Sequence, residues 1–107
     1  MTTPLTLTAD TRGDGSPVLA ATGEIDMSNS AELAAALGAV IGQDSRPVLV
    51  DLRGVGYLDS AGLTVLLTHA SDIEVLATPL LAPVLTICGL TDLTSVHGLD
   101  AEDAGDS

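Results

Sequence analysis

Lysine, tryptophan and phenylalanine are absent from this chain, and Tyr57 is its one aromatic residue. The three basic side chains are Arg12, Arg46 and Arg53, against fifteen acids, so the formal net charge is −12. Phosphate backbones and anionic lipid surfaces are bound by clusters of Lys and Arg, which are missing here. Without a lysine, P-loop and Schiff-base chemistry are also excluded. We therefore expect no direct binding of nucleic acid and no binding to a membrane.

Cysteine is nearly absent as well. Cys88 is the only one, so no internal disulfide can form, and this fits a reducing compartment. Its position on an apolar helical stripe favours a small core residue, with oxidation sensing as the lesser alternative. No basic segment followed by an apolar run opens the chain, and Pro83 interrupts the longest apolar stretch, at 80–90. We therefore expect no signal peptide, no membrane span and a cytoplasmic location.

The 107 residues, 46% of them apolar, suffice for one compact domain with a core of Leu, Val, Ile and Ala. We assign that domain to residues 1–99. Residues 100–107 carry four acids and almost no hydrophobic side chain, so we expect an acidic, mobile tail there.

Hydrophobic periodicity predicts an alternation of strands and amphipathic helices. Strands are expected at 5–9, 18–22, 48–52, 73–77 and 94–96, and helices at 33–41, 63–70 and 81–88. The turn residues at 11–17 predict an antiparallel hairpin, and the helical crossovers predict parallel strands after it. The fold class is therefore a single α/β domain with a mixed, mostly parallel sheet of about five strands and helices packed on one face.

Several boundaries can be predicted in more detail. The unalternating segment 48–52 is typical of a central strand covered on both faces, and Gly54 and Gly56 predict a loop after it. Asn29 with Glu32 resembles a capping box for the first helix. Pro83 predicts that the third helix is kinked or starts late.

The segment Asp59-Ser60-Ala61-Gly62 lies between the expected central strand and second helix. In the structural interpretation, Asp59 or Ser60 is an N-cap and Gly62 allows close packing. In the functional interpretation, the free amides and dipole of a helix N-terminus favour a phosphate on the Ser60 hydroxyl.

Catalysis and metal binding have weaker support. A nucleophilic Ser60 would need His69 or His97 as its base, but Leu58 replaces the first glycine of the G-x-S-x-G elbow. His69 lies about 13 Å along the expected helix, whereas His97 is not constrained by the sequence. The remaining potential ligands have no metal-binding spacing. We expect no enzymatic activity, no cofactor and no metal.

Three segments together resemble a known family. They are GEIDMSNSAEL at 23–33, VLVDLRGVGYLDSAGLTVLL at 48–67 and TPLLAPVLTICGL at 78–90. In this order they are similar to bacterial anti-sigma factor antagonists, which are STAS domains. The resemblance covers most of the chain.

The resemblance implies a protein that works by partner switching. Ser60 would be phosphorylated by an anti-sigma factor that is itself a serine kinase, and a phosphatase would reset it. The unphosphorylated form would bind the anti-sigma factor and so release a sigma factor. The partner-binding and switch residues would be Asp26, Met27, Ser28, Asp59, Ser60, Gly62 and Leu63.

Two departures from the family leave an alternative open. The region between the second helix and the next strand is about eight residues shorter than usual, about two helical turns. The third helix has no charged residue from Thr78 to Leu90. The alternative is an unphosphorylated STAS interaction module in a signalling or transport assembly, favoured if the third helix exposes an apolar patch.

Overall fold

The structure is a computed structural model that describes residues 3–42 and 46–99. The predicted tail at 100–107 lies outside the described residues. Five strands form one sheet in the order β1-β2-β3-β4-β5. They are β1 (Thr6–Thr11), β2 (Pro17–Ile25), β3 (Val48–Leu58), β4 (Ile73–Leu76) and β5 (Val96–His97). The β1–β2 pair is antiparallel and the three other pairs are parallel, which confirms the predicted fold class.

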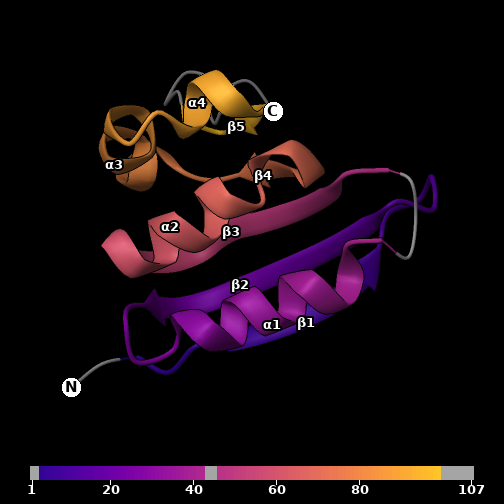
Figure 1. Ribbon diagram of the computed structural model, residues 1–107, viewed down its shortest axis with the longest axis horizontal. Helices are drawn as coiled ribbons and strands as arrows, with labels where there is room; N and C mark the ends of the chain where they lie inside the picture. The colour runs from indigo at the N-terminus through magenta and orange to yellow at the C-terminus, as the bar shows by residue number, and fades with distance from the viewer. Residues whose placement is uncertain (1–2, 43–45, 100–107) are drawn as a thin grey trace.

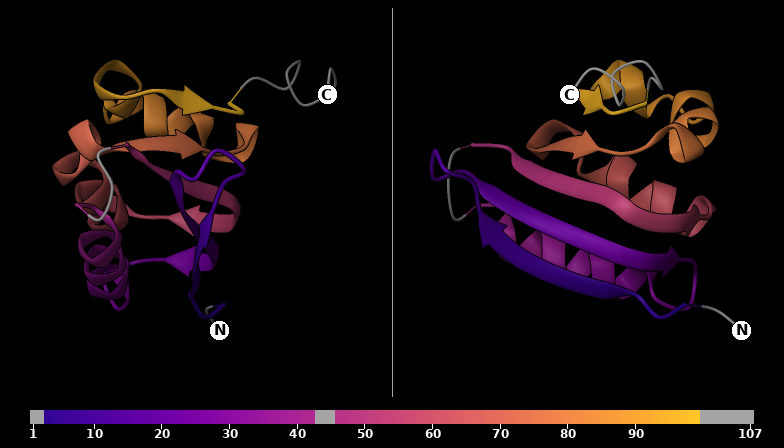
Figure 2. Two further views of the ribbon diagram at one scale, coloured as in Figure 1. Left: turned by 90° about the vertical axis from the view of Figure 1, so that its right-hand side faces the viewer. Right: turned by 180° about the vertical axis from the view of Figure 1, so that it is seen from behind.

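The three predicted helices are present, and one further short helix and two 3₁₀ turns are added to them. They are α1 (Ser30–Val40), α2 (Ser60–Thr68), α3 (Ala82–Ile87), α4 (Leu90–Leu93) and the 3₁₀ turns η1 (Ala70–Asp72) and η2 (Pro79–Leu81). Figures 1 and 2 show α1 and α2 side by side on one face of the sheet. The short helix α4 was not predicted, because four residues are too few to show a helical period.

The core lies between the sheet and these helices. Alternate strand residues such as Leu19, Val50 and Val75 are fully buried on the helix side, against Leu33 of α1 and Leu66 of α2. The opposite face of the sheet has no helix over it in the described part of the chain (Figure 2). We call it the open face.

The central strand β3 departs from its prediction in length and in burial. It runs to Leu58, so Gly54 and Gly56 lie inside the strand and their prediction as a loop is wrong. Two register shifts against β2 each insert one extra residue into β3, as β-bulges do, and this hides the alternation from the sequence. Leu49 is only half-buried because it points to the open face, so β3 is covered on one face only.

The predicted capping box at the start of α1 is also wrong. Asn29 occupies the N-cap position but makes no side-chain cap hydrogen bond. Its Oδ1 accepts from the Asp26 amide at 2.9 Å, and its Nδ2 donates to the Glu24 carbonyl at 2.9 Å. The side chain fixes the preceding loop instead of the helix.

The predicted late start of the third helix is confirmed. η2 begins at Pro79, and α3 begins only at Ala82, where Pro83 lies in the first turn and needs no helical amide partner. Gly89 follows α3 with a φ of 88°, the left-handed conformation expected after a helix end.

Candidate functional site

Two loops meet where the parallel strands β2 and β3 end. Ile25 and Leu58 are register partners, so the residues that follow them emerge at the same edge of the sheet. The amide of Asp59 donates to the carbonyl of Ile25 at 3.1 Å. This edge carries the loop at 26–29 and the N-terminus of α2.

Asp59 joins these two segments through both of its carboxylate oxygens. Oδ1 accepts from the amides of Ala61 at 2.9 Å and Gly62 at 3.1 Å, which confirms Asp59 as the N-cap of α2. Oδ2 accepts from the amide of Met27 at 3.1 Å. One side chain therefore sets the position of the 26–29 loop relative to α2.

Ser60 is the first residue of α2 and is exposed. Its carbonyl accepts from the Thr64 hydroxyl at 2.8 Å, but within the described part of the chain no hydrogen bond holds its own hydroxyl. The hydroxyl is therefore accessible to a reagent or an enzyme. The Ala61 and Gly62 amides, in the same first turn, already donate to Asp59, so the helix N-terminus offers an added phosphate less than the sequence suggested.

The carboxylate of Asp26 holds the loop before α1 through hydrogen bonds within that loop. Asp26 Oδ1 accepts from the Ser28 amide at 2.9 Å and from the Ser28 hydroxyl. These hydrogen bonds stabilise the ionised form and lower the pKa of Asp26 below its ordinary value. Asp26 therefore presents a negative charge on this edge at neutral pH.

Gly62 and Leu63 lie under the surface, not on it. Both are buried. A Cβ on Gly62 would lie 2.5 Å from Leu58 Cδ1 and 2.7 Å from Ile25 Cγ2. Gly62 therefore lets α2 approach the ends of both strands, and this close contact positions Ser60.

Two large side chains are exposed in or next to the segments that meet at this edge of the sheet. Met27 is 81% exposed and Tyr57 is 51% exposed. Sequence reasoning singled out Met27 but gave Tyr57 no role. The signal that the sequence offered for Tyr57 was an aromatic residue two positions before the Asp59-Ser60 pair. The sequence could not show which way the Tyr57 side chain points, because that depends on the bulges of β3.

The histidines are not placed for catalysis by Ser60. His69 Nδ1 lies 2.9 Å from the carbonyl of Val65, one turn back in α2. His97 belongs to the open face, on the other side of the sheet from α2. Among the described residues, no three His, Cys, Asp or Glu side chains are grouped to hold a metal ion.

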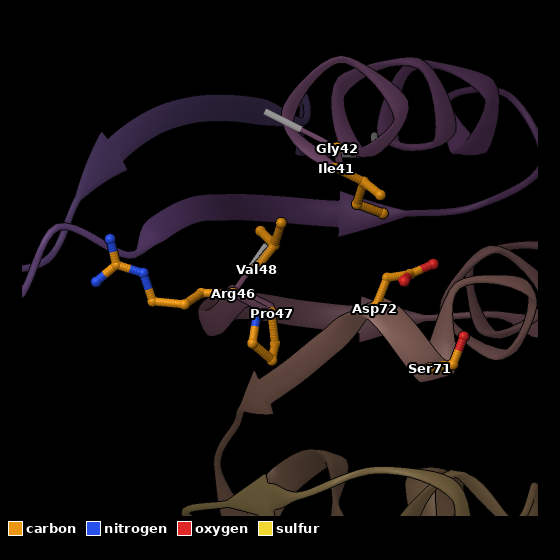
Figure 3. Close-up of a pocket in the computed structure, with 7 residues that line it drawn as sticks. All are labelled: Ile41, Gly42, Arg46, Pro47, Val48, Ser71 and Asp72. Carbon is orange, nitrogen blue, oxygen red and sulfur yellow. The ribbon is translucent and has the colours of Figure 1, made fainter. Parts of the chain in front are cut away.

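Cys88 and a cavity at the far end of the sheet lie away from Ser60. Cys88 is half-buried, and its thiol approaches the Leu85 carbonyl at 3.4 Å. A cavity of about 240 Å³ lies at the opposite end of the sheet from Ser60, lined by Ile41, Gly42, Arg46, Pro47, Val48, Ser71 and Asp72 (Figure 3). Figure 3 shows Arg46 pointing away from the two polar side chains of η1, and it donates to the carbonyl of Asp14. The polar groups that line the cavity do not point toward one common position where a ligand could bind.

None of the helices within 3–42 and 46–99 is long and apolar enough to cross a membrane.

Comparison with solved structures gives consistent matches. An anti-sigma factor antagonist from Mycobacterium paratuberculosis is 27% identical, covers 94% of this chain and 91% of its own, and superposes with a TM-score of 0.80. The antagonist SpoIIAA in its unphosphorylated form is 17% identical, with 94% of both chains covered and a TM-score of 0.68. A protein from Shewanella loihica described as having a SpoIIAA-like fold is 14% identical, with 97% and 93% covered and a TM-score of 0.61.

The two lower identities show the fold alone, and no curated protein matches the chain. The family model described as "Mlab, STAS domain" matches residues 8–100, which is most of the chain. This protein belongs to the STAS domain family.

Proposed function

We propose that this protein is an anti-sigma factor antagonist that binds an anti-sigma serine kinase and is released when Ser60 is phosphorylated. It acts in the cytoplasm by partner switching: binding frees a sigma factor, and a phosphatase restores the binding form. The protein itself carries out no catalysis. The observation that carries the proposal is the Asp59 bridge, which combines an accessible serine and an exposed loop in one surface.

The contacts of Ser60 support its role as the acceptor. A kinase needs a hydroxyl that can reach its active site, and Ser60 is exposed at a helix end with its hydroxyl free of hydrogen bonds to the described residues. Ala61 follows it, so no adjacent hydroxyl competes. The anti-sigma factor antagonist that is 27% identical to this chain adds independent support for the regulatory class.

The charges around Ser60 support the direction of the switch. A phosphate adds about −1.5 to −2 charges at neutral pH. The carboxylate of Asp59 already accepts from the amides of Gly62 and Met27, and the carboxylate of Asp26, the residue before Met27, belongs to the same loop. An interface that forms over this edge would have to bury the phosphate next to carboxylates. Repulsion and desolvation then favour release of the partner.

Intact mass spectrometry tests the acceptor. The protein is incubated with ATP, magnesium and an anti-sigma kinase, together with Ser60→Ala and the control Ser71→Ala, which removes an exposed hydroxyl away from this edge. We expect one added phosphate on the wild type and on Ser71→Ala and none on Ser60→Ala. Phosphate that persists in Ser60→Ala would refute the assignment.

The charge switch needs a separate binding measurement. We expect Ser60→Glu to bind the kinase at least several-fold more weakly than Ser60→Ala does, because a coupling free energy of about 1–3 kcal/mol corresponds to about 5- to 150-fold. Thr64→Glu places the same charge one turn along α2 and is expected to bind nearly as well as the wild type. Equal weakening by both glutamates would indicate a general charge effect.

A second candidate function is supported by a different surface. Leu80 is 67% exposed and Ile87 is 85% exposed, on a segment without charge. Large apolar side chains exposed on an uncharged segment favour an interaction module held in a fixed signalling or transport assembly. Ile87→Asp would disrupt that assembly and leave kinase binding at the Ser60 edge intact, so the two candidates can be separated by one variant.

A further inference from the structure

The open face carries a shallow cavity over β3, β4 and β5. Its volume is about 310 Å³, and it is lined by Arg12, Leu49, Glu74, Leu76 and His97. Parallel strands are normally covered on both faces, so an uncovered face over three parallel strands is unusual. None of these residues takes part in the Ser60 surface.

The floor of the cavity is apolar. Leu49 and Leu76 are half-buried and point away from the core, because their strand neighbours Val50 and Val75 are fully buried on the helix side. Leu49 is the register partner of Glu74 across β3 and β4. A flat hydrocarbon body resting on the two leucines would remove apolar surface from water.

The rim is charged, and its arginine is not fully engaged. Arg12 Nη1 lies 4.0 Å from Glu74 Oε2, the outer limit for an ion pair, and the Arg12 side chain is 45% exposed. By contrast, Arg53 on the same face donates to both oxygens of Asp51, at 3.0 and 2.9 Å. Arg12 therefore retains donors for another acceptor, and the exposed His97 lies on the same cavity.

We propose that this cavity binds a small monocarboxylate with a flat apolar body. The ligand carboxylate pairs with the Arg12 guanidinium, whose planar fork suits two parallel hydrogen bonds, and His97 adds a ring nitrogen as a second donor. The apolar body lies on Leu49 and Leu76. The volume is at the lower end of the range for small-molecule pockets, about 300–1,000 Å³.

Glu74 restricts the charge of the ligand. Its carboxylate lies on the same rim as Arg12, so a second negative charge on the ligand would face it directly. A phosphate or a dicarboxylate is therefore disfavoured relative to a single carboxylate. This selectivity follows from the chain's own ion pair and does not involve the switch at Ser60.

Titration of ¹⁵N-labelled full-length protein with 2-naphthoate tests the site by NMR, with 2-naphthalenemethanol as a neutral ligand of the same shape. We expect saturable shifts of the amides of Leu49, Leu76 and His97 with the carboxylate and much weaker binding of the alcohol. Arg12→Gln should weaken binding about tenfold or more, since a hydrogen bond to a charged group contributes at least about 1.4 kcal/mol, which is a factor of about ten. For Arg53→Gln, the matched control on the same face, the affinity for 2-naphthoate should stay within about twofold of wild type, because the Arg53 guanidinium already donates to both oxygens of Asp51.

Three results would overturn the proposal, and the dispersion of the same spectra reports whether each variant is folded. One is the absence of saturable shifts at any soluble concentration of 2-naphthoate. Another is equal affinity for the alcohol, which would leave only an apolar patch. The third concerns Glu74→Gln, which should tighten 2-naphthoate binding by removing the repulsion; weaker binding would contradict the role given to this residue.

Discussion

Replacing Asp59 separates the two tasks that its carboxylate performs. Asp59→Ala removes the N-cap of α2 and the acceptor of the Met27 amide, whereas Asp59→Asn keeps one oxygen for the cap and presents an NH₂ group to Met27. Loss of an N-cap costs about 1 kcal/mol, and Asn caps as well as Asp. An exposed hydrogen bond contributes about 0.5 kcal/mol, the low end of the usual range. The free energy of unfolding should therefore fall by about 1.5 kcal/mol for Ala and about 0.5 kcal/mol for Asn.

Urea unfolding followed by circular dichroism measures this difference, since the chain has no tryptophan to report by fluorescence. With an m-value of about 1.5 kcal/mol/M, the midpoints should fall by about 1 M for Ala and about 0.3 M for Asn. Hydrogen exchange should show faster exchange of the Met27 amide in both variants and of the Ala61 and Gly62 amides only in Asp59→Ala. Equal midpoints for the two variants would refute the division of roles between the two oxygens.

Three further predictions concern packing, pH and binding. Gly62→Ala should destabilise the fold by about 1–3 kcal/mol, because the added methyl group meets Leu58. Gly38→Ala, which adds a methyl group in open space on α1, should stabilise the fold by about 0.5–1 kcal/mol. Thermal melts that rank the two variants in the opposite order would contradict the packing argument. The pKa of Asp26 is depressed in the folded state, so its contribution to stability is present above the unfolded pKa and is lost as the pH falls through the folded value. Asp26→Asn should therefore reduce the loss of Tm between about pH 5 and pH 3, and an unchanged slope would show that the loop bonds do not matter. Met27→Ala should weaken kinase binding several-fold, measured by calorimetry, without changing the unfolding midpoint, and unchanged affinity would exclude Met27 from the interface.

Much of the fold could be predicted because its elements are locally consistent. Leu33 and Leu37 repeat at helical spacing and are both fully buried in α1. Pro83 and Gly89 mark the two ends of α3 through backbone constraints that act within a single turn. The N-cap at Asp59 also depends on local geometry alone, and it was predicted as one of two possibilities.

What the sequence did not disclose depends on contacts between strands. The bulges of β3 appear only when its register against β2 is known, so Gly54 was predicted in a loop although it lies in the strand. Asn29 has the right spacing for a capping box, but the carbonyl of Glu24 and the amide of Asp26 compete successfully for its side chain. The bridge from Asp59 to Met27 spans 32 residues and has no local signal.

The distribution of charge links the acidic composition to the direction from which a partner would approach. Helices α1 to α4 contain no lysine or arginine, while Arg12 and Arg53 both lie at the open face. Among the described residues, neither the 26–29 loop nor α2 contains an arginine, so these two segments of the Ser60 edge present Asp26 and Asp59 without a guanidinium of their own to neutralise them. A basic partner would be steered to this edge, and its association rate should fall steeply with ionic strength. Phosphate at Ser60 would strengthen the same long-range attraction, so release must come from short-range repulsion and desolvation. We therefore expect phosphorylation to act mainly on the dissociation rate, and a slower association rate with unchanged dissociation would contradict the switch as described.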